Sequence, residues 1–218
     1  MSDQSPSSAS EDTPLAEAYM SALRSHALML IALGYARMSP ANFKAAEEDA
    51  ITGELSREMK AVIESEFAPE WSEHYSVQEQ VRANAPDKLG KARPIVDIEF
   101  ERHKHGRRPR LRFEAKRLGP NHRAKGYFGD GGLEAFVTGY YDRTHEDAGM
   151  LGYVQSHNEA TWAEKLATAS AGRTAPLSII RPWTAFPGEG FPTFTYNTQH
   201  RDQSGNSLNV LHVLLSFV

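Results

Sequence analysis

The strict alternation of residues 110–118 (RLRFEAKRL) restricts the fold of this chain more than any other feature of its sequence. One face of the segment would carry Leu111, Phe113 and Ala115, and the other face Arg112, Glu114 and Lys116. This two-residue period is that of a β-strand, because successive side chains of a strand point to opposite faces. Residues 95–100 (IVDIEF) are also strand-like, and a turn-like HGRRP at 105–109 separates the two segments. The sequence therefore predicts a β-hairpin in the centre of the chain.

Helix-favouring and strand-favouring segments surround this hairpin. Helices are predicted at 15–38, 39–67, 77–83, 132–141 and 158–170, with Ser39, Asp130 and Asn158 as N-caps of the second, fourth and fifth. Loops are expected at 84–92 and 119–131, and further strands at 149–156, 177–181, 193–197 and 207–218. This order predicts a single mixed α/β domain over residues 15–218, after a Ser-rich, disordered tail at 1–14.

Charge is unevenly distributed along the chain. The 218 residues carry a net charge of −4, yet residues 91–125 hold twelve Lys and Arg against four acids. This stretch therefore carries +8 and leaves −12 for the rest of the chain. A basic stripe on an acidic protein is typical of a surface that contacts a phosphate backbone, although a solvated, charged hairpin gives the same pattern.

Composition excludes several classes of site. The chain has no cysteine, which rules out disulfides and thiolate metal sites and fits a reducing cytoplasm, where we expect the protein. The N-terminus is polar and acidic, without the pattern of a secretory signal. The longest apolar run, at 27–33, is too short to cross a bilayer, so no membrane partner is expected.

Three residues of the predicted hairpin suggest metal-assisted chemistry. Glu114 and Lys116 project from one face of the second strand, and Asp97 comes from the first. If Asp97 faces the same side, two carboxylates and an ammonium converge. Paired carboxylates suit Mg²⁺, which takes one or two of them together with substrate phosphate. A lysine beside the metal-bound water could orient that water or stabilise charge on phosphoryl oxygens.

Asp97 followed by Glu114-Ala115-Lys116 resembles the PD-(D/E)xK nuclease superfamily, whose signature is an acid on one strand and (D/E)xK on the next. The order of predicted elements over about 40–170 is also similar, with 171–218 as a C-terminal strand extension. The resemblance implies a restriction-endonuclease-like mixed central sheet flanked by helices. It also implies a Mg²⁺-dependent nuclease, with Mn²⁺ as an alternative metal and DNA rather than RNA as the expected substrate. FEAKRL and GMLGYV further resemble small stand-alone bacterial members, some of which act in defence against phage or other foreign DNA.

The choice of acids leaves one alternative and adds one residue. Members of the superfamily often have proline directly before the first acid, whereas here Pro94 precedes Asp97 by three residues. Glu99 lies on the same predicted face and is the alternative to Asp97. On a helical wheel of residues 39–67, Glu48 falls near the centre of the apolar stripe, where a carboxylate is costly unless it is paired or bound to metal. Glu48 is therefore a candidate fourth site residue and metal ligand, or else a member of a half-buried ion pair.

Other residues carry weaker indications. Arg112, Arg117 and Arg108 are the candidate contacts to nucleic acid, or else serve solubility. His103 and His105 have zinc-like spacing, but the neighbouring arginines favour a solvated turn. Tyr140 and Tyr141 could stack on bases, although helix packing is the simpler interpretation. His200 and His212 are expected to be ordinary surface or core histidines.

Two other functions remain open. The chain could be a non-catalytic nucleic-acid-binding module that keeps the stripe but binds no metal. It could also be a regulatory subunit that acts through residues 183–194, which form either a partner surface or a packed cap. A homodimer, or a partner in a larger defence complex, is compatible with a nuclease, since two cuts need two sites.

Overall fold

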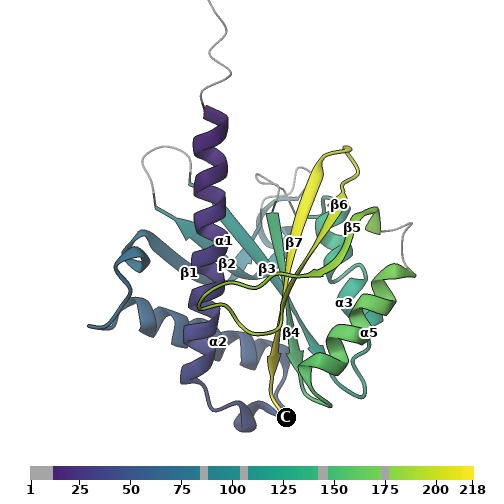
Figure 1. The fold of residues 1–218 in the computed structure, drawn as a ribbon, viewed down its shortest axis with the longest axis horizontal. Helices are drawn as coiled ribbons and strands as arrows, with labels where there is room; N and C mark the ends of the chain where they lie inside the picture. The colour runs from purple at the N-terminus through teal and green to yellow at the C-terminus, as the bar shows by residue number, and fades with distance from the viewer. Residues whose placement is uncertain (1–11, 84–87, 104–107, 142–146, 173–176) are drawn as a thin grey trace, which may run out of the picture.

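The computed structural model describes residues 12–83, 88–103, 108–141, 147–172 and 177–218, and side chains from residue 17 onward. Its centre is a seven-stranded sheet with the order β1-β2-β3-β4-β7-β6-β5 (Figure 1). The strands are β1 (Tyr75–Arg82), β2 (Ile95–Arg102), β3 (Arg110–Leu118), β4 (Asp147–Val154), β5 (Ile179–Ala185), β6 (Thr195–Arg201) and β7 (Ser207–Ser216).

The sheet mixes antiparallel and parallel pairs. Strands β1, β2 and β3 form an antiparallel meander. The chain then crosses over to β4, which lies parallel to β3 and also parallel to β7. Strands β6 and β5 continue antiparallel from β7. All eight residues of β4 are buried, as expected for a parallel strand covered on both faces.

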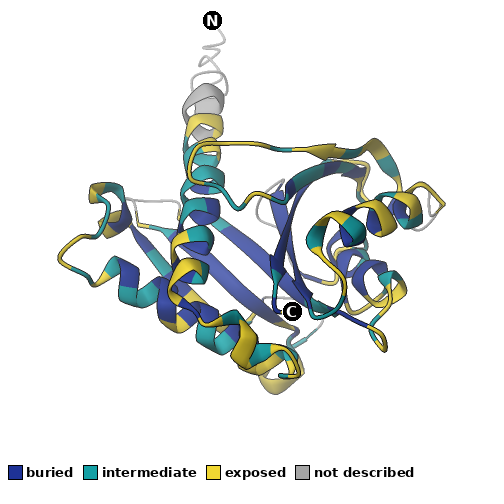
Figure 2. Cartoon of the chain, turned by 60° about the horizontal axis from the view of Figure 1, so that its bottom comes forward, coloured by how far each residue is buried: buried dark blue, intermediate teal, exposed yellow. Residues whose placement is uncertain are grey.

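Helices cover both faces of the sheet. The two long N-terminal helices, α1 (Asp12–Arg37) and α2 (Glu48–Ile63), share one apolar core with the inward face of β1 to β4 and β7. The short helices α3 (Ala124–Phe128) and α4 (Leu133–Val137), with α5 (Glu159–Ala171), form a second core on the opposite face. Figure 2 shows buried strands between helices whose outer faces are exposed.

The central hairpin is confirmed. Strands β2 and β3 pair antiparallel from Glu101↔Arg110 to Ile98↔Phe113. The coarse class, mixed α/β with a sheet between helices, is also confirmed. Strands occur near all four other predicted positions, as β4, β5, β6 and β7, with β5 reaching further along the chain than expected.

Of the predicted helices, the one at 39–67 is shorter than expected and the one at 77–83 is wrong. The helix at 39–67 is instead a 3₁₀ turn, Pro40–Phe43, followed by α2, which starts only at Glu48. Ser39 makes no side-chain cap to the turn. Residues 77–83 belong to β1 rather than to a helix, because Tyr75 and Val77 are buried at period two while the strand pairs with β2.

The segment before β4 also differs from expectation. The predicted loop at 119–131 contains α3, and α4 ends at Val137 rather than at residue 141. Asp130 does not cap α4: its carboxylate accepts from the N–H of Gly131, and Gly132 is the N-cap residue. Asn158 is confirmed as the N-cap of α5, where its side chain accepts from Thr161 N at 2.8 Å.

At the N-terminus, α1 begins at Asp12, inside the stretch expected to be disordered, while residues 1–11 lie outside the described residues. Of the helices described, none is both long enough and apolar enough to cross a membrane.

Candidate metal and catalytic site

The two hairpin strands separate at one end. Their pairing stops at Ile98↔Phe113, so the next backbone N–H groups of β3 have no partner on β2. Carboxylates take over: Ala115 N donates to Asp97 Oδ2 at 2.7 Å, and Arg117 N donates to Glu48 Oε2 at 3.1 Å. Because buried backbone donors must be satisfied, these two hydrogen bonds fix both acids along the opened edge of β3.

The charged side chains that face each other across β2 and β3 are of opposite sign along the paired part of the hairpin but of like sign at this end. Arg110 pairs with Glu101 at 2.8 Å, and Arg112 pairs with Glu99 at 2.7 Å. The next acids on the two strands, Asp97 and Glu114, are instead like charges. Burial raises the pKa of Asp97 above its usual value. Burial, reinforced by the charge of Asp97, raises the pKa of Glu114 to about 7.

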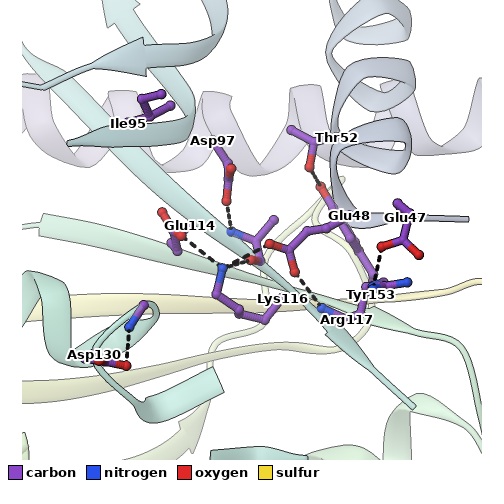
Figure 3. Close-up of polar contacts among 12 residues, drawn as sticks. Glu47, Glu48, Thr52, Ile95, Asp97, Glu114, Lys116, Arg117, Asp130 and Tyr153 are labelled. Atoms are coloured by element: carbon purple, nitrogen blue, oxygen red, sulfur yellow. Dashed lines mark hydrogen bonds and ion pairs between the residues drawn. The ribbon is translucent and has the colours of Figure 1, made fainter. Parts of the chain in front are cut away.

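Lys116 lies at the centre of the cluster. Its Nζ donates to Glu48 Oε1 and to Glu114 Oε1, both at 3.0 Å, and to the carbonyl oxygen of Ala115 at 2.6 Å (Figure 3). Burial opposes the charge of Lys116, but the carboxylates of Glu114 and Glu48 outweigh it and raise its pKa. One ammonium thus faces three carboxylates, counting Asp97, and the cluster has excess negative charge.

Two further side chains hold these acids in place. The Tyr141 hydroxyl donates to Glu114 Oε2 at 2.8 Å, and the Gln80 amide donates to Asp97 Oδ1 at 3.1 Å. Gln80 has φ 52, a left-handed backbone conformation that is uncommon outside glycine. The sequence did not reveal either role, because Gln80 was assigned to a helix and Tyr141 to helix packing or base stacking. An isolated tyrosine or glutamine gives no signal of its own.

The structure brings together all four candidate residues, Asp97, Glu114, Lys116 and Glu48. Glu48 reaches the cluster from the first turn of α2, where its half-buried side chain forms the ion pair with Lys116. Glu99, the alternative to Asp97, lies elsewhere: its carboxylate is 2.7 Å from Arg112 and 3.6 Å from Arg110. The geometry therefore favours Asp97 as the first acid.

The arginines of the basic stripe are largely engaged with acids. Arg112 is buried against Glu99, which gives it a structural role in the sheet instead of free access to a phosphate. Arg117 pairs with Glu47 at 2.6 Å. Arg108 pairs with Glu101 at 3.0 Å but keeps 58% of its side chain exposed. Glu99 and Glu101 are already subtracted in the +8 of residues 91–125, so these pairs leave that net charge almost unchanged but hold the arginines against neighbouring acids. The stripe alone is therefore weak evidence for DNA contact.

Within the described residues, no group of three or more His, Asp or Glu is arranged to hold a metal ion as it stands. Lys116 Nζ instead lies among the oxygens of Glu48, Glu114 and Ala115. The donor set nevertheless fits a hard divalent cation: it consists of carboxylate and carbonyl oxygens, and its acids exceed its single base. Asp97, Glu114 and Glu48 are the residues that could hold such an ion.

The remaining candidates lie away from this cluster. His200 and His212 are buried and join Thr198 in one hydrogen-bonded chain, as expected for core histidines. Trp183 packs on His212 at 4.3 Å between ring centroids, so its side chain belongs to a packed cap and not to an open partner surface. His103 is exposed just beyond β2, and its predicted partner His105 lies outside the described residues.

Comparisons with known proteins give no further assignment: no family model matches the chain, and no curated protein or solved structure matches it.

Proposed function

We propose that the protein is a metal-dependent nuclease that hydrolyses phosphodiester bonds of DNA. The observation that carries the proposal is the convergence of three carboxylates on one lysine, at the point where β2 and β3 separate. Ion pairs between β2 and β3 elsewhere match acid with base, but here Asp97 and Glu114 leave negative charge in excess. Buried like charges are costly, so their persistence supports a cationic ligand.

Each residue has a role in this proposal. Asp97, Glu114 and Glu48 would hold Mg²⁺, or Mn²⁺, which supplies Lewis acidity toward a phosphoryl oxygen and a more acidic water. Tyr141 and Gln80 keep the two strand carboxylates oriented toward the opened edge. Lys116, whose raised pKa keeps it charged, donates hydrogen bonds to the attacking water or to the phosphoryl oxygens.

The topology supports the same proposal. An antiparallel meander of β1, β2 and β3 followed by β4 parallel to β3, with helices on both faces, agrees with the order of elements that the PD-(D/E)xK resemblance implies. A restriction-endonuclease-like fold, cytoplasmic location, defence against foreign DNA and a homodimeric or larger assembly are parts of this proposal.

A cleavage assay tests it directly. Supercoiled plasmid and linear DNA are incubated with the protein and Mg²⁺ or Mn²⁺, beside Glu114→Ala, Lys116→Ala and Glu99→Gln. The first two variants should lose cleavage while keeping the folded circular dichroism spectrum. Glu99→Gln alters the same face of the hairpin outside the cluster and should retain cleavage. Full activity in Lys116→Ala would refute the assigned chemistry.

One observation favours a second candidate, a nucleic-acid-binding module without metal. Lys116 already satisfies the oxygens of Glu48 and Glu114. Isothermal titration with Mg²⁺ and Mn²⁺ separates the two candidates: binding that is lost in Glu114→Gln supports the nuclease. DNA binding without any metal binding supports the module.

A further inference from the structure

A hollow lies at the carboxyl ends of the parallel strands β3 and β4. Its volume is about 380 Å³, and its lining consists of Gly119, Pro120, Arg123, Ala124, Ser156, His157, Trp162 and Lys165. Carboxyl ends of parallel strands are a common place for ligands in open α/β sheets. The lining comes from the turns after the two strands and from helices α3 and α5.

The charge of this hollow is opposite to that of the acid cluster. Arg123 and Lys165 line it, His157 adds a third nitrogen base, and none of the lining residues is acidic. Within the described part of the chain, neither Arg123 nor Lys165 takes part in an ion pair, unlike Arg108, Arg110, Arg112 and Arg117. The cations of the hollow therefore remain available to an anion.

A hydroxyl in the lining is left without a partner. Ser156 Oγ is buried and, among the described residues, has no hydrogen-bond partner. A buried hydroxyl without a partner costs free energy, and such groups call for an explanation such as a ligand. The chain around it is held firmly: Trp162 Nε1 donates to Ser156 O at 2.7 Å, and His157 adopts φ 60. This strained turn keeps Ser156 and His157 on the hollow.

The hollow lies on the face of the sheet to which Glu114 and Lys116 of the acid cluster project. Leu118 shares the strand face of Glu114 and Lys116 and packs in the core formed with α3 and α5. Gly119 is three residues beyond Lys116, roughly 10 Å along a strand at about 3.3 Å per residue.

We propose that this hollow binds a phosphate group through Arg123, Lys165 and Ser156. This inference rests on the proposed function where it names the ligand: a backbone phosphate of the DNA strand whose scissile bond lies at the acid cluster. Trp162, over whose ring Lys165 Nζ lies at 4.7 Å, holds the lysine at the rim of the hollow.

The test measures binding of a fluorescent 20-base-pair duplex by anisotropy as a function of KCl concentration. It uses the full chain with Glu114→Gln, so that the duplex is not cut. The test variant adds Arg123→Ala and Lys165→Ala. The matched control adds Arg181→Ala and Arg201→Ala, which remove the same charge from exposed positions on β5 and β6.

The test variant should bind at least about tenfold more weakly at 0.1 M KCl, and its salt slope should fall by about 2, one for each lost phosphate contact. The control should bind within about twofold of the parent protein. Equal weakening in both double variants indicates diffuse charge attraction and overturns the proposal. No weakening in the test variant also overturns it, even if Glu114→Ala abolishes cleavage and the nuclease proposal stands.

Ser156→Ala provides a charge-neutral test of the same hollow. Removing a hydroxyl without a partner should leave the melting temperature unchanged or raise it, yet weaken duplex binding about threefold. Unchanged binding in Ser156→Ala removes this residue from the site and contradicts the proposal as stated.

A titration with inorganic phosphate and pyrophosphate separates two sources of the ligand. If the protein neither binds nor cuts DNA but binds pyrophosphate, and Arg123→Ala with Lys165→Ala abolishes that binding, the nuclease proposal fails. The phosphate site then stands as a site for a free phosphorylated ligand.

Discussion

Replacing Glu114 by glutamine should make the metal-free protein more stable, although it removes a central site residue. The pKa of Glu114 is raised from 4.5 to about 7, a difference of about 2.5 units. At about 1.4 kcal/mol per unit, ionised Glu114 costs the folded state up to about 3 kcal/mol at pH 8. Glutamine is neutral and nearly isosteric. It keeps an oxygen that accepts from Lys116, so the substitution removes this cost.

The dependence on pH follows from the direction of the shift. The folded pKa of Glu114 lies above the unfolded one, so its contribution to stability is fully present below about pH 4.5 and is lost as pH rises through about 7. Glu114→Gln should therefore gain up to about 3 kcal/mol over wild type at pH 8 but only about 1 kcal/mol at pH 5. For a chain of this length, the larger gain corresponds to an increase in melting temperature of up to roughly 10 °C.

Thermal and urea unfolding at pH 5 and pH 8, with EDTA and with Mg²⁺, measure this effect. Saturating Mg²⁺ should stabilise wild type but not Glu114→Gln. The stability advantage of Glu114→Gln over wild type should therefore shrink or change sign. The matched control is Glu99→Gln, which weakens the buried ion pair with Arg112 and should destabilise at both pH values by about 3 kcal/mol. A Glu114→Gln protein that is less stable than wild type at pH 8 in EDTA would refute the argument from like charges.

Three further predictions concern the cluster and the cores. Lys116→Met removes the ammonium among the carboxylates and should abolish cleavage while tightening Mg²⁺ binding by about tenfold, as measured by calorimetry; unchanged affinity contradicts the central position of Lys116. His212, whose pKa burial holds well below 6.5, must stay neutral in the folded state. The contribution of His212 to stability is therefore present above pH 6.5 and lost as pH falls. In the Glu114→Gln background, the melting temperature should drop between pH 7 and pH 5. A melting temperature that does not change with pH would exclude this effect. Gly152→Ala places a methyl group 2.6 Å from a carbon of Leu214 and 2.7 Å from one of Leu118. The free energy of unfolding, measured in urea, should therefore fall by about 1–3 kcal/mol. An unchanged value would mean that both leucines move aside.

The prediction for His212 rests on a hydrogen-bonded chain whose proton positions are determined. The carbonyl of Leu177 can only accept, so His200 Nδ1 donates to it and neutral His200 Nε2 accepts from the Thr198 hydroxyl. Thr198 Oγ1 must then accept from His212 Nε2, which leaves His212 Nδ1 to accept from the Tyr127 hydroxyl. A proton added to His212 would face the Tyr127 hydroxyl, which donates to this nitrogen, and would also face the charge of His200 if that ring were protonated.

The parts of the site that the sequence revealed are those with a local period. Residues 110–118 alternate strictly, and this alone places Glu114 and Lys116 on one face of a strand. Glu48 was found because a carboxylate interrupted an apolar helical stripe, although the helix begins at Glu48 and not at residue 39. Each of these residues is identified by a pattern within a single helix or strand, so each can be found without knowledge of the tertiary structure.

The parts that the sequence did not reveal depend on long-range pairing. Gln80 faces Asp97 only because residues 75–82 form an edge strand on β2, where helix propensity is overridden by pairing. Tyr141 reaches Glu114 because α4 ends at Val137 and the chain turns back toward the sheet. The ion pairs of Arg110 and Arg112 follow from the register of β2 and β3, which composition does not encode. The basic stripe therefore looked more available to DNA than it is.

The ion pairs along the β2–β3 hairpin distinguish the acid cluster from an ordinary charged strand face. Where β2 and β3 are paired, every acid on this face has an arginine beside it: Glu101 has Arg110, and Glu99 has Arg112. A third such pair would have stabilised the sheet in the same way, since arginine is abundant in this stretch. Instead the strands separate, and Asp97 and Glu114 are buried together with a raised pKa. A fold that neutralises its other buried hairpin acids but leaves these two in excess retains a free-energy cost, and a bound cation is the simplest way for that cost to be offset.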